Sequence, residues 1–174
     1  MDLQKLTVVT GGAASGKSAH AEGLALASVR TPRIYIATAQ AWDDEMKAKV
    51  ATHRDRRGSD WVTIEAPYDL PGALEGLAAE AVVLIDCATL WLTNHLLAEA
   101  DLDAEAERLL AALAACPAPV IVVTNEVGQG IVPDNALARR FRNAQGRLNQ
   151  RLAAAADTVV AVISGLPLVL KGAA

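Results

Sequence analysis

Glycine, lysine and serine residues near the N-terminus are spaced so that they could bind the phosphates of a nucleotide. The segment reads Gly11-x-x-x-x-Gly16-Lys17-Ser18, which is the pattern of a phosphate-binding loop, or P-loop. Glycines let the backbone wrap closely around phosphate oxygens, and the amides of the loop and of a following helix point at the anion. We expect Lys17 to reach the β- and γ-phosphates and Ser18 to ligate Mg²⁺. A plain glycine turn is the alternative, but the strand-like run before the loop and the helical pattern after it favour triphosphate binding.

A carboxylate at the end of a later apolar run is a candidate for the magnesium side of the same site. Asp86 follows the residues Val-Val-Leu-Ile at 82–85. An aspartate that ends a buried strand near a P-loop can hold the metal. Asp86 could instead cap the next helix. Glu126 ends a second apolar run, over 120–125, and is a weaker candidate for the same role.

A histidine among arginines is a second group that could do chemistry. His53, Arg54, Asp55, Arg56 and Arg57 end a segment with helical spacing, so the histidine and two of the arginines can share one face. Neighbouring guanidinium groups favour neutral imidazole, which is a nucleophile, and they bind phosphate oxygens. The cluster is consistent with attack of His53 on a phosphorus atom. Basic residues at a helix end also suit a solvated surface, and the spacing leaves both interpretations open.

Alternating strands and helices must position these residues. We expect strands over 6–10, 33–38, 61–65, 81–86, 119–125, 158–164 and 168–171, with a turn at 165–167. We expect helices over 18–29, 43–57, 69–80, 90–100, 103–115 and 135–156, the last with Leu137, Phe141, Leu148 and Leu152 on one stripe. This order predicts a single α/β domain over 1–174, with a mostly parallel sheet, helices on both faces and a C-terminal antiparallel edge strand. Ligands bind at the carboxyl ends of the strands in such sheets.

The composition narrows the class of protein. Net charge is −4, so no overall field attracts nucleic acid or anionic membrane. The apolar runs are too short to cross a bilayer and the N-terminus has no signal-peptide pattern, so we expect a cytoplasmic protein. Cys87 and Cys116 have no metal-ligand spacing and are expected to be buried thiols. We assign no role to His20 or His95.

Several longer motifs identify a family that the chain resembles. They are, in order along the chain, the P-loop, Tyr-Ile-Ala-Thr-Ala-Gln at 35–40, Trp-Asp-Asp-Glu-Met at 42–46, His-Arg-x-Arg-Arg at 53–57, Thr-Asn-Glu-Val-Gly-Gln-Gly-Ile-Val-Pro at 124–133, Ala-Arg-Arg-Phe-Arg at 138–142 and Gly-Arg-Leu-Asn-Gln at 146–150. Over nearly its whole length the sequence closely resembles the bifunctional adenosylcobinamide kinase/adenosylcobinamide-phosphate guanylyltransferases of cobalamin (vitamin B12) biosynthesis. The segment 124–133 and the His-Arg cluster are more specific than the P-loop.

The resemblance implies two reactions and a RecA-like P-loop NTPase fold. ATP or GTP phosphorylates the aminopropanol hydroxyl of adenosylcobinamide. GTP then guanylylates a histidine, which corresponds to His53, and the GMP passes to adenosylcobinamide phosphate with release of pyrophosphate. The resemblance also implies a homotrimer with the corrinoid near a subunit junction. No nucleic-acid partner is expected.

The resemblance further implies which residues make up the site. His53 and Lys17 would be catalytic, and Ser18 and Asp86 would hold Mg²⁺. The nucleotide contacts would be Gly11, Gly12, Ala13, Ala14, Ser15, Gly16, Lys17, Ser18, Thr38, Ala39, Gln40, Arg54, Asp55, Arg56, Arg57, Glu65 and Asp86. Many members carry arginine where Ala14 stands, so any contact of that arginine is absent here. The sequence does not assign Asn125, Glu126 or the arginines over 139–142 to the corrinoid side, a subunit interface or simple capping.

Two other functions fit parts of the sequence. A kinase that uses the P-loop alone would transfer label only from the γ-phosphate and would tolerate loss of His53. A non-catalytic nucleotide switch or RecA-like assembly protein would bind nucleotide without forming a stable product. The negative net charge offers such an assembly protein no evident nucleic-acid track.

Overall fold

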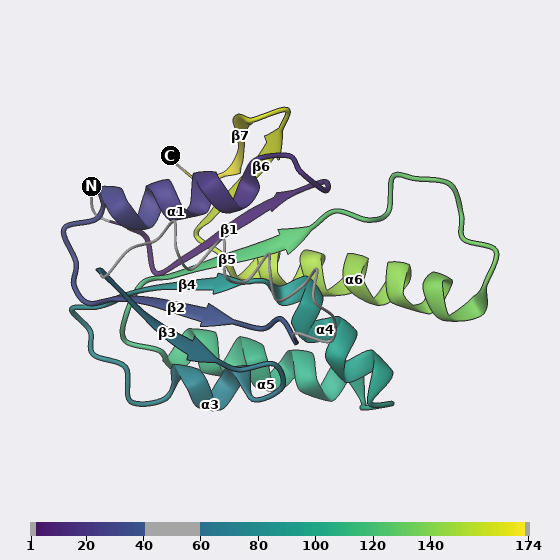
Figure 1. The fold of residues 1–174 in the computed structure, drawn as a ribbon, viewed down its shortest axis with the longest axis horizontal. Coiled ribbons are helices and arrows are strands. Elements are labelled where there is room, and N and C mark those ends of the chain that lie inside the picture. Colours follow the sequence, from purple (N-terminus) through teal and green to yellow (C-terminus); the bar gives the residue numbers. More distant parts are fainter. Residues whose placement is uncertain (1–2, 41–59, 173–174) are drawn as a thin grey trace.

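The computed structural model describes residues 3–40 and 60–172 of the 174-residue chain. The helix expected over 43–57 lies outside these ranges, and with it the His53 and Arg54–Arg57 cluster. Within them the elements are β1 (Leu6–Gly11), α1 (Lys17–Ala27), β2 (Arg33–Ala37), β3 (Trp61–Glu65), α3 (Leu70–Leu74), β4 (Val82–Asp86), α4 (Ala88–Leu97), α5 (Leu102–Ala115), β5 (Val120–Asn125), α6 (Ala136–Ala155), β6 (Thr158–Ile163) and β7 (Leu166–Lys171). Figure 1 shows their arrangement.

A seven-stranded sheet forms the centre of the molecule, with strand order β3-β2-β4-β5-β1-β6-β7. The first six strands in this order, β3, β2, β4, β5, β1 and β6, pair in parallel with their neighbours. Strand β7 at the edge pairs antiparallel with β6. This confirms the predicted mostly parallel sheet with an antiparallel edge strand. Strand β5 lies between β1, which leads into the phosphate-binding loop, and β4, which ends at Asp86. The carboxyl ends of these three strands therefore form one edge.

Helices cover both faces of the sheet, and each face has its own core. On one face α1 packs through Ala21 and Ala25 against Val9, Leu84 and Val123. On the other face α3, α4, α5 and α6 cover a larger cluster that includes Trp91, Leu109 and Leu148. The central strands β1, β4 and β5 are rich in β-branched residues and almost fully buried, as expected of parallel strands between two helical layers. None of the helices in the described ranges is long and apolar enough to cross a membrane.

The end of α3, the start of β7 and the buried stripe of α6 differ clearly from the sequence-based expectation, beside shifts of one to three residues at other element ends. Helix α3 is much shorter than 69–80, because the chain is extended at Glu75 and turns left-handed at Gly76, with φ of 70°. The final turn is Ser164-Gly165, with φ values of 52° and 80°, so β7 begins at Leu166 and includes Pro167, which an edge strand tolerates. In α6 the buried stripe is displaced toward the C-terminus: Leu137 is 51% exposed, whereas Ala144, Gln145, Leu148 and Leu152 are buried.

Candidate functional site at the carboxyl edge of the sheet

The P-loop connects the end of β1 to the start of α1. Helix α1 begins at Lys17, and its N-cap residue Gly16 has a φ of 92° and offers no side-chain cap to the first amides of the helix. These amides therefore stay available to an anion. Lys17 Nζ donates to Gly12 O over 2.9 Å, which places the ammonium group over the loop. A helix N-terminus with a lysine over it is suited to bind phosphate groups.

The loop is held closely from two sides. The amide of Glu126, directly after β5, donates to Gly11 O over 3.0 Å, and the amide of Gly165 in the β6–β7 turn donates to Ser15 O over 2.8 Å. A Cβ atom on Gly11 would lie 2.5 Å from Val162 O and 2.6 Å from Ser15 Oγ, so only glycine fits there. The Ser15 hydroxyl is buried and has no hydrogen-bond partner among the described residues. The loop geometry thus depends on β5 and on the β6–β7 hairpin.

Asp86 ends β4 on the face that carries α1. Side chains alternate between faces along a strand. Leu84, two residues earlier, belongs to the cluster packed on α1, so Asp86 faces the same side. Its carboxylate accepts a hydrogen bond from Tyr35 Oη over 3.2 Å. The next residue, Cys87, is buried, and burial followed by the charge of Asp86 raises the pKa of its thiol to about 11. The thiol therefore stays neutral.

Thr38 and Gln40, which follow β2, differ in whether their side chains are hydrogen-bonded within the protein. Thr38 is fully buried, and its hydroxyl both donates to Cys87 O over 2.7 Å and accepts from Cys87 N over 2.8 Å. This hydroxyl joins the end of β2 to the end of β4. Gln40 has a buried Nε2 with no hydrogen-bond partner among the described residues. Of the segment Thr38, Ala39 and Gln40, the glutamine amide is thus the side-chain group that remains available for a ligand.

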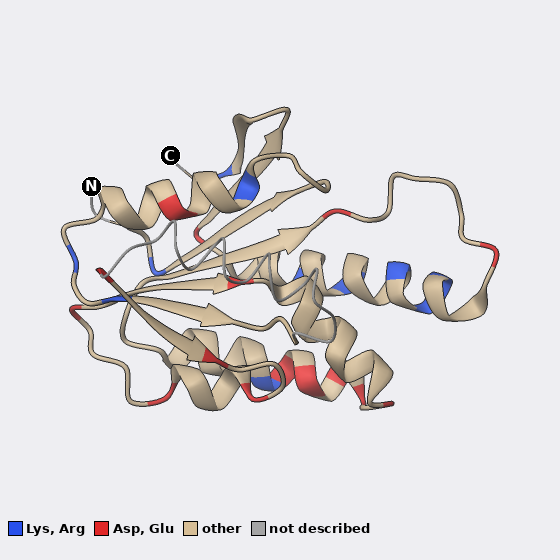
Figure 2. Ribbon diagram, in the orientation of Figure 1, with Lys and Arg blue, Asp and Glu red and all other residues tan. Residues whose placement is uncertain are grey.

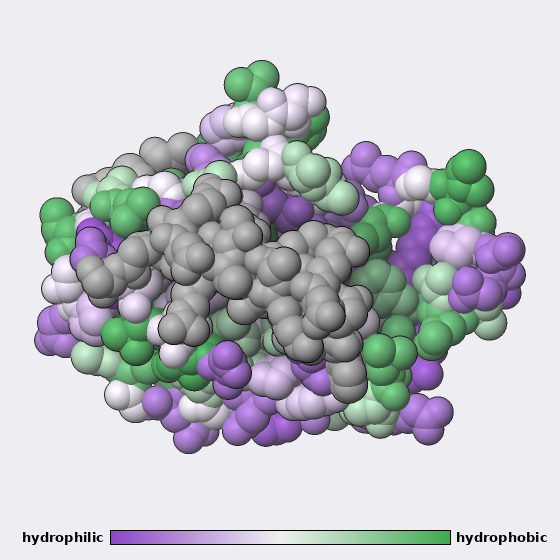
Figure 3. Space-filling model, in the orientation of Figure 1, coloured by the Kyte–Doolittle hydropathy of each residue, from purple (hydrophilic) through white to green (hydrophobic). Residues whose placement is uncertain are grey.

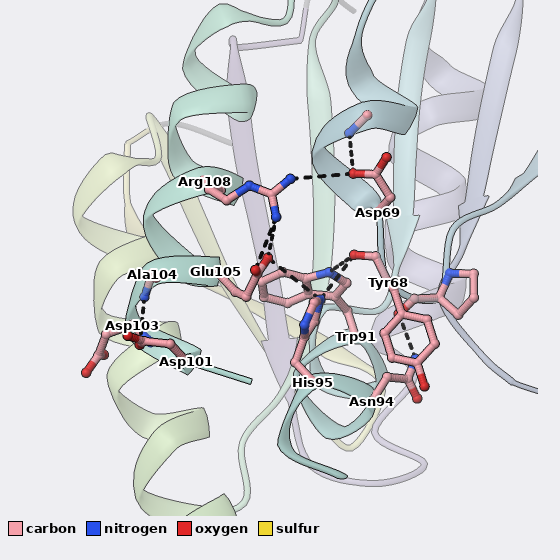
Figure 4. Close-up of polar contacts among 12 residues, drawn as sticks. Tyr68, Asp69, Trp91, Asn94, His95, Asp101, Asp103, Ala104, Glu105 and Arg108 are labelled. Atoms are coloured by element: carbon pink, nitrogen blue, oxygen red, sulfur yellow. Dashed lines mark hydrogen bonds and ion pairs between the residues drawn. The ribbon is translucent and has the colours of Figure 1, made fainter. Parts of the chain in front are cut away.

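Helix α4 holds the segment that follows Glu65 and β3. Asn94 Nδ2 donates to both Thr38 O and Pro67 O, over 2.9 and 2.8 Å. Trp91 Nε1 donates to Tyr68 O over 2.8 Å, and His95 Nε2 lies 3.1 Å from the same oxygen. Figure 4 shows Trp91 and His95 converging on Tyr68, below the ion pair between the exposed Arg108 and the half-buried Glu105. The buried polar side of α4 thereby positions the ends of β2 and β3.

The arginines near the start of α6 bind the loop that joins β5 to this helix. Arg139 donates to Pro133 O and Asp134 O over 3.0 and 2.7 Å. Arg142 donates to Gly128 O and, over 3.4 Å, to Gly130 O. Figure 2 shows the basic residues spread along α6. Within the described residues, Arg139 and Arg142 thus have a loop-holding role, which the sequence left open.

The structure brings together the P-loop, Asp86 and the end of β2, and it places Glu65 at the exposed end of β3 on the same edge. It also adds residues that sequence reasoning missed. Four buried or half-buried polar side chains surround the end of β5, namely Thr89, Thr124, Gln145 and Asn149. The signal for the last two was present: an amide pair spaced i, i+4 on the buried stripe of α6.

Comparison with known proteins agrees with the resemblance seen in the sequence. The family described as cobinamide kinase / cobinamide phosphate guanyltransferase matches residues 7–170. The bifunctional adenosylcobalamin biosynthesis protein CobU of Salmonella typhimurium is 45% identical, with 95% of this chain and 99% of that protein covered. The protein of the same name from Escherichia coli is 43% identical over the same shares. CobP of Pseudomonas aeruginosa is 45% identical, covering 95% of this chain and 96% of that one.

Solved structures with lower identity support the fold alone. The RadB recombinase aligns with a TM-score of 0.54 at 21% identity, covering 90% of this chain and 73% of that one. The flagellar accessory protein FlaH from Methanocaldococcus jannaschii aligns with a TM-score of 0.52 at 14% identity, covering 96% and 78%. These similarities agree with the expected α/β fold, in which a mostly parallel sheet carries helices on both faces.

Proposed function

The chain belongs to the cobinamide kinase / cobinamide phosphate guanyltransferase family, and on that premise we propose that it phosphorylates adenosylcobinamide and then guanylylates the product. The observation that carries the proposal is the P-loop, with Lys17 over it and Asp86 on the same face of the sheet. This arrangement binds a triphosphate by its phosphates. Both reactions use cytoplasmic nucleoside triphosphates, and we propose the cytoplasm as their location.

In the kinase step the aminopropanol hydroxyl oxygen of adenosylcobinamide attacks the γ-phosphorus of ATP or GTP. The new O–P bond forms as the bond from the γ-phosphorus to the β-phosphate oxygen breaks, which releases a nucleoside diphosphate, and the hydroxyl proton is lost. Lys17 stabilises the charge on the β- and γ-phosphate oxygens. The free amides at the start of α1 add to this stabilisation.

In the guanylyl transfer step His53 attacks the α-phosphorus of GTP. An N–P bond forms and pyrophosphate leaves. A phosphate oxygen of adenosylcobinamide phosphate then attacks the same phosphorus and the N–P bond breaks, which gives adenosylcobinamide-GDP. Covalent catalysis divides one difficult displacement into two. Arg54, Arg56 and Arg57, next to His53 in the sequence, would stabilise the charge of the departing pyrophosphate.

Mg²⁺ and the guanine nucleotide complete the proposed site. A hydroxyl and a carboxylate fit the few protein ligands that Mg²⁺ takes beside water and phosphate oxygens. Ser18 at the start of α1 and Asp86 offer this set, because α1 packs against β4. The metal supplies charge neutralisation for the phosphates. We assign the remaining nucleotide contacts to Thr38, Ala39, Gln40, Asp55 and Glu65. Because the hydroxyl, N–H and C=O of Thr38 are all hydrogen-bonded within the protein, Thr38 would contribute to this part of the site mainly by holding Ala39 and Gln40 in place.

Labelled GTP tests the proposal against its alternatives. The protein is incubated with α-labelled or γ-labelled GTP and then denatured. We expect acid-labile, base-stable label from the α position only, because a phosphoramidate has this stability, and we expect none in His53→Ala. His20→Ala is the matched control, since His20 lies on α1 next to the P-loop and should leave labelling intact.

The outcomes separate the possible functions. Absence of α-label from the wild-type protein would contradict the guanylyl transfer step. Label that survives in His53→Ala but is lost in His20→Ala would move the nucleophile to α1. Transfer of γ-label to adenosylcobinamide tests the kinase step, and its presence without α-label would indicate a kinase that uses the P-loop alone. Binding without any transfer would indicate a nucleotide switch.

We also propose that the chain forms a homotrimer in which β7 contacts a second copy. Strand β7 projects from the sheet and exposes Leu166, Leu168 and Leu170, between 54% and 72% accessible. Figure 3 shows apolar surface at the tip of this hairpin. An exposed apolar edge strand needs a partner or promotes aggregation. We expect light scattering to give about three times the 18.2 kDa of one chain. Leu168→Lys should shift the mass toward the monomer, and a wild-type monomer would contradict the proposal.

A further inference from the structure

A closed ring of hydrogen bonds surrounds the end of β5. The main-chain N–H of Asn125 donates to Thr89 Oγ1 over 2.8 Å, and Thr89 Oγ1 lies 3.5 Å from Thr124 Oγ1. Thr124 Oγ1 donates to Asn149 Oδ1 over 2.6 Å, and Asn149 Nδ2 donates to Asn125 O over 2.9 Å. The ring thus begins and ends on the backbone of Asn125. It ties one residue of β5 to α4 and α6 at once.

Gln145 fixes the direction of the ring. Its Nε2 donates to Thr124 Oγ1 over 2.9 Å and to Asn149 Oδ1 over 2.8 Å. The Thr124 proton is used on Asn149, so across the 3.5 Å contact only Thr89 can donate; its hydroxyl also interacts with the Cys87 thiol. Gln145 is fully buried, and its Oε1 has no hydrogen-bond partner among the described residues. An apolar side chain in place of Gln145 could not donate the hydrogen bonds to Thr124 and Asn149. These two bonds offset the cost of burying the unpaired Gln145 Oε1 in the core.

The ring fixes the backbone of Asn125, and strand alternation places its side chain on the face of the sheet that carries α1. Thr124 points toward α6, and side chains alternate along a strand, so Asn125 points to the face of α1, as Val123 does. Asp86 lies on that face at the end of the neighbouring β4. Asn125 is in register with Gly11 on its other side. On the β4 side, Asp86 is in register with Val123, two residues before Asn125, so the half-buried Asn125 side chain lies on the same face and at the same edge as the P-loop and Asp86.

We propose that the Asn125 side chain donates a hydrogen bond to the terminal phosphate of a bound triphosphate, and that Asn149 and Gln145 are positioning residues for it. A carboxamide N–H is a suitable donor to an anionic oxygen. Lys17 and the α1 amides approach the phosphates from the side of the P-loop. A group at the end of β5 would therefore reach the terminal phosphate of the nucleotide. Glu126, directly after β5, holds the P-loop through the hydrogen bond from its N–H to Gly11 O. The ring at Asn125 therefore fixes the position of the Asn125 backbone relative to the P-loop.

The inference rests on the proposed function only in that a triphosphate occupies the P-loop, so binding tests it without turnover. We compare the affinities of wild type, Asn125→Ala and Asn149→Asp for Mg²⁺ with α,β-methylene-GTP, which cannot guanylylate the protein, and for GDP. Asn149→Asp replaces the donor to Asn125 O with an oxygen. Both variants should bind the triphosphate analogue roughly tenfold more weakly and GDP within about twofold of wild type. Asn143→Asp is the control, since it makes the same change on the exposed side of α6.

The ratio of the two affinities separates positioning from a structural defect. A merely structural role would weaken both ligands equally or neither, and either result in Asn125→Ala would overturn the contact. A normal ratio in Asn149→Asp with a lowered ratio in Asn125→Ala would overturn the positioning role alone. If Asn149→Asp does not fold, Thr89→Val is measured in its place. That substitution breaks the ring at the bond from the main-chain N–H of Asn125. Failure of α-labelling or kinase activity in wild type would leave these ratios unaffected and so would be distinguished from failure of this inference.

Discussion

Replacing Lys17 with alanine is expected to lower both the kinase rate and the rate of guanylylation by roughly a hundredfold to a thousandfold, the effect of removing one positioned charged donor from a developing anion. The Nζ atom lies over the loop, 2.9 Å from Gly12 O, and needs only to exchange this carbonyl for phosphate oxygens. Both reactions use the same triphosphate pocket in our proposal, so one substitution should impair both. Stability should change little, because the bond to Gly12 O is exposed.

The matched control is Lys5→Ala. Lys5 is an exposed lysine that precedes β1 at the opposite end of the strand, so it tests the loss of a positive charge without loss of the site. Rates are measured as γ-label transfer to adenosylcobinamide and as α-label retained on the protein. A Lys17→Ala variant that keeps its guanylylation rate but loses kinase activity would show that the two steps use the triphosphate in different positions. Retention of both rates would contradict the role of the P-loop.

Most of the fold was predictable because it depends on local patterns. Each apolar β-branched run became a strand, and the loop after β1 and Asp86 lie, as expected, at the carboxyl ends of strands in one sheet. The boundaries that failed depend on backbone conformation rather than hydrophobicity. Gly76 ends α3 early, and the two positive φ values at Ser164 and Gly165 make a shorter turn than the Pro167 pattern indicated. Periodicity carries no information about such single residues.

The polar groups that hold the site were not predictable in the same way. Asn94, Gln145 and Asn149 lie on helix faces that the sequence indicates to be apolar, and their partners are backbone carbonyls or side chains between 4 and 56 residues away. Only the folded sheet brings such groups together. A buried amide among leucines is nevertheless a signal, because it requires a hydrogen-bond partner. Thr38 shows the opposite case: the resemblance implies a nucleotide contact, and the structure shows a hydroxyl already engaged with Cys87.

The largest expected effect on stability comes from Trp91→Ala. Trp91 is fully buried in the main core, its Nε1 donates to Tyr68 O, and its ring lies 4.7 Å from that of His95. Truncation removes the whole indole and leaves a cavity, which costs about 3–5 kcal/mol of the free energy of unfolding. For a domain of this size that corresponds to a fall in Tm of roughly 6–20 °C. Denaturant and thermal unfolding of the nucleotide-free protein measure it.

Two further variants separate volume from hydrogen bonding. Trp91→Phe keeps most of the ring but loses the donor, and Tyr68 O retains His95 Nε2 at 3.1 Å, so we expect a cost of about 1 kcal/mol. Trp61→Ala is the matched control, because Trp61 is half-buried on the edge strand β3 and contacts Tyr35 edge-on at 6.2 Å. Its cost should be less than half that of Trp91→Ala. Equal costs for the two tryptophans would contradict the assignment of Trp91 to the centre of the core.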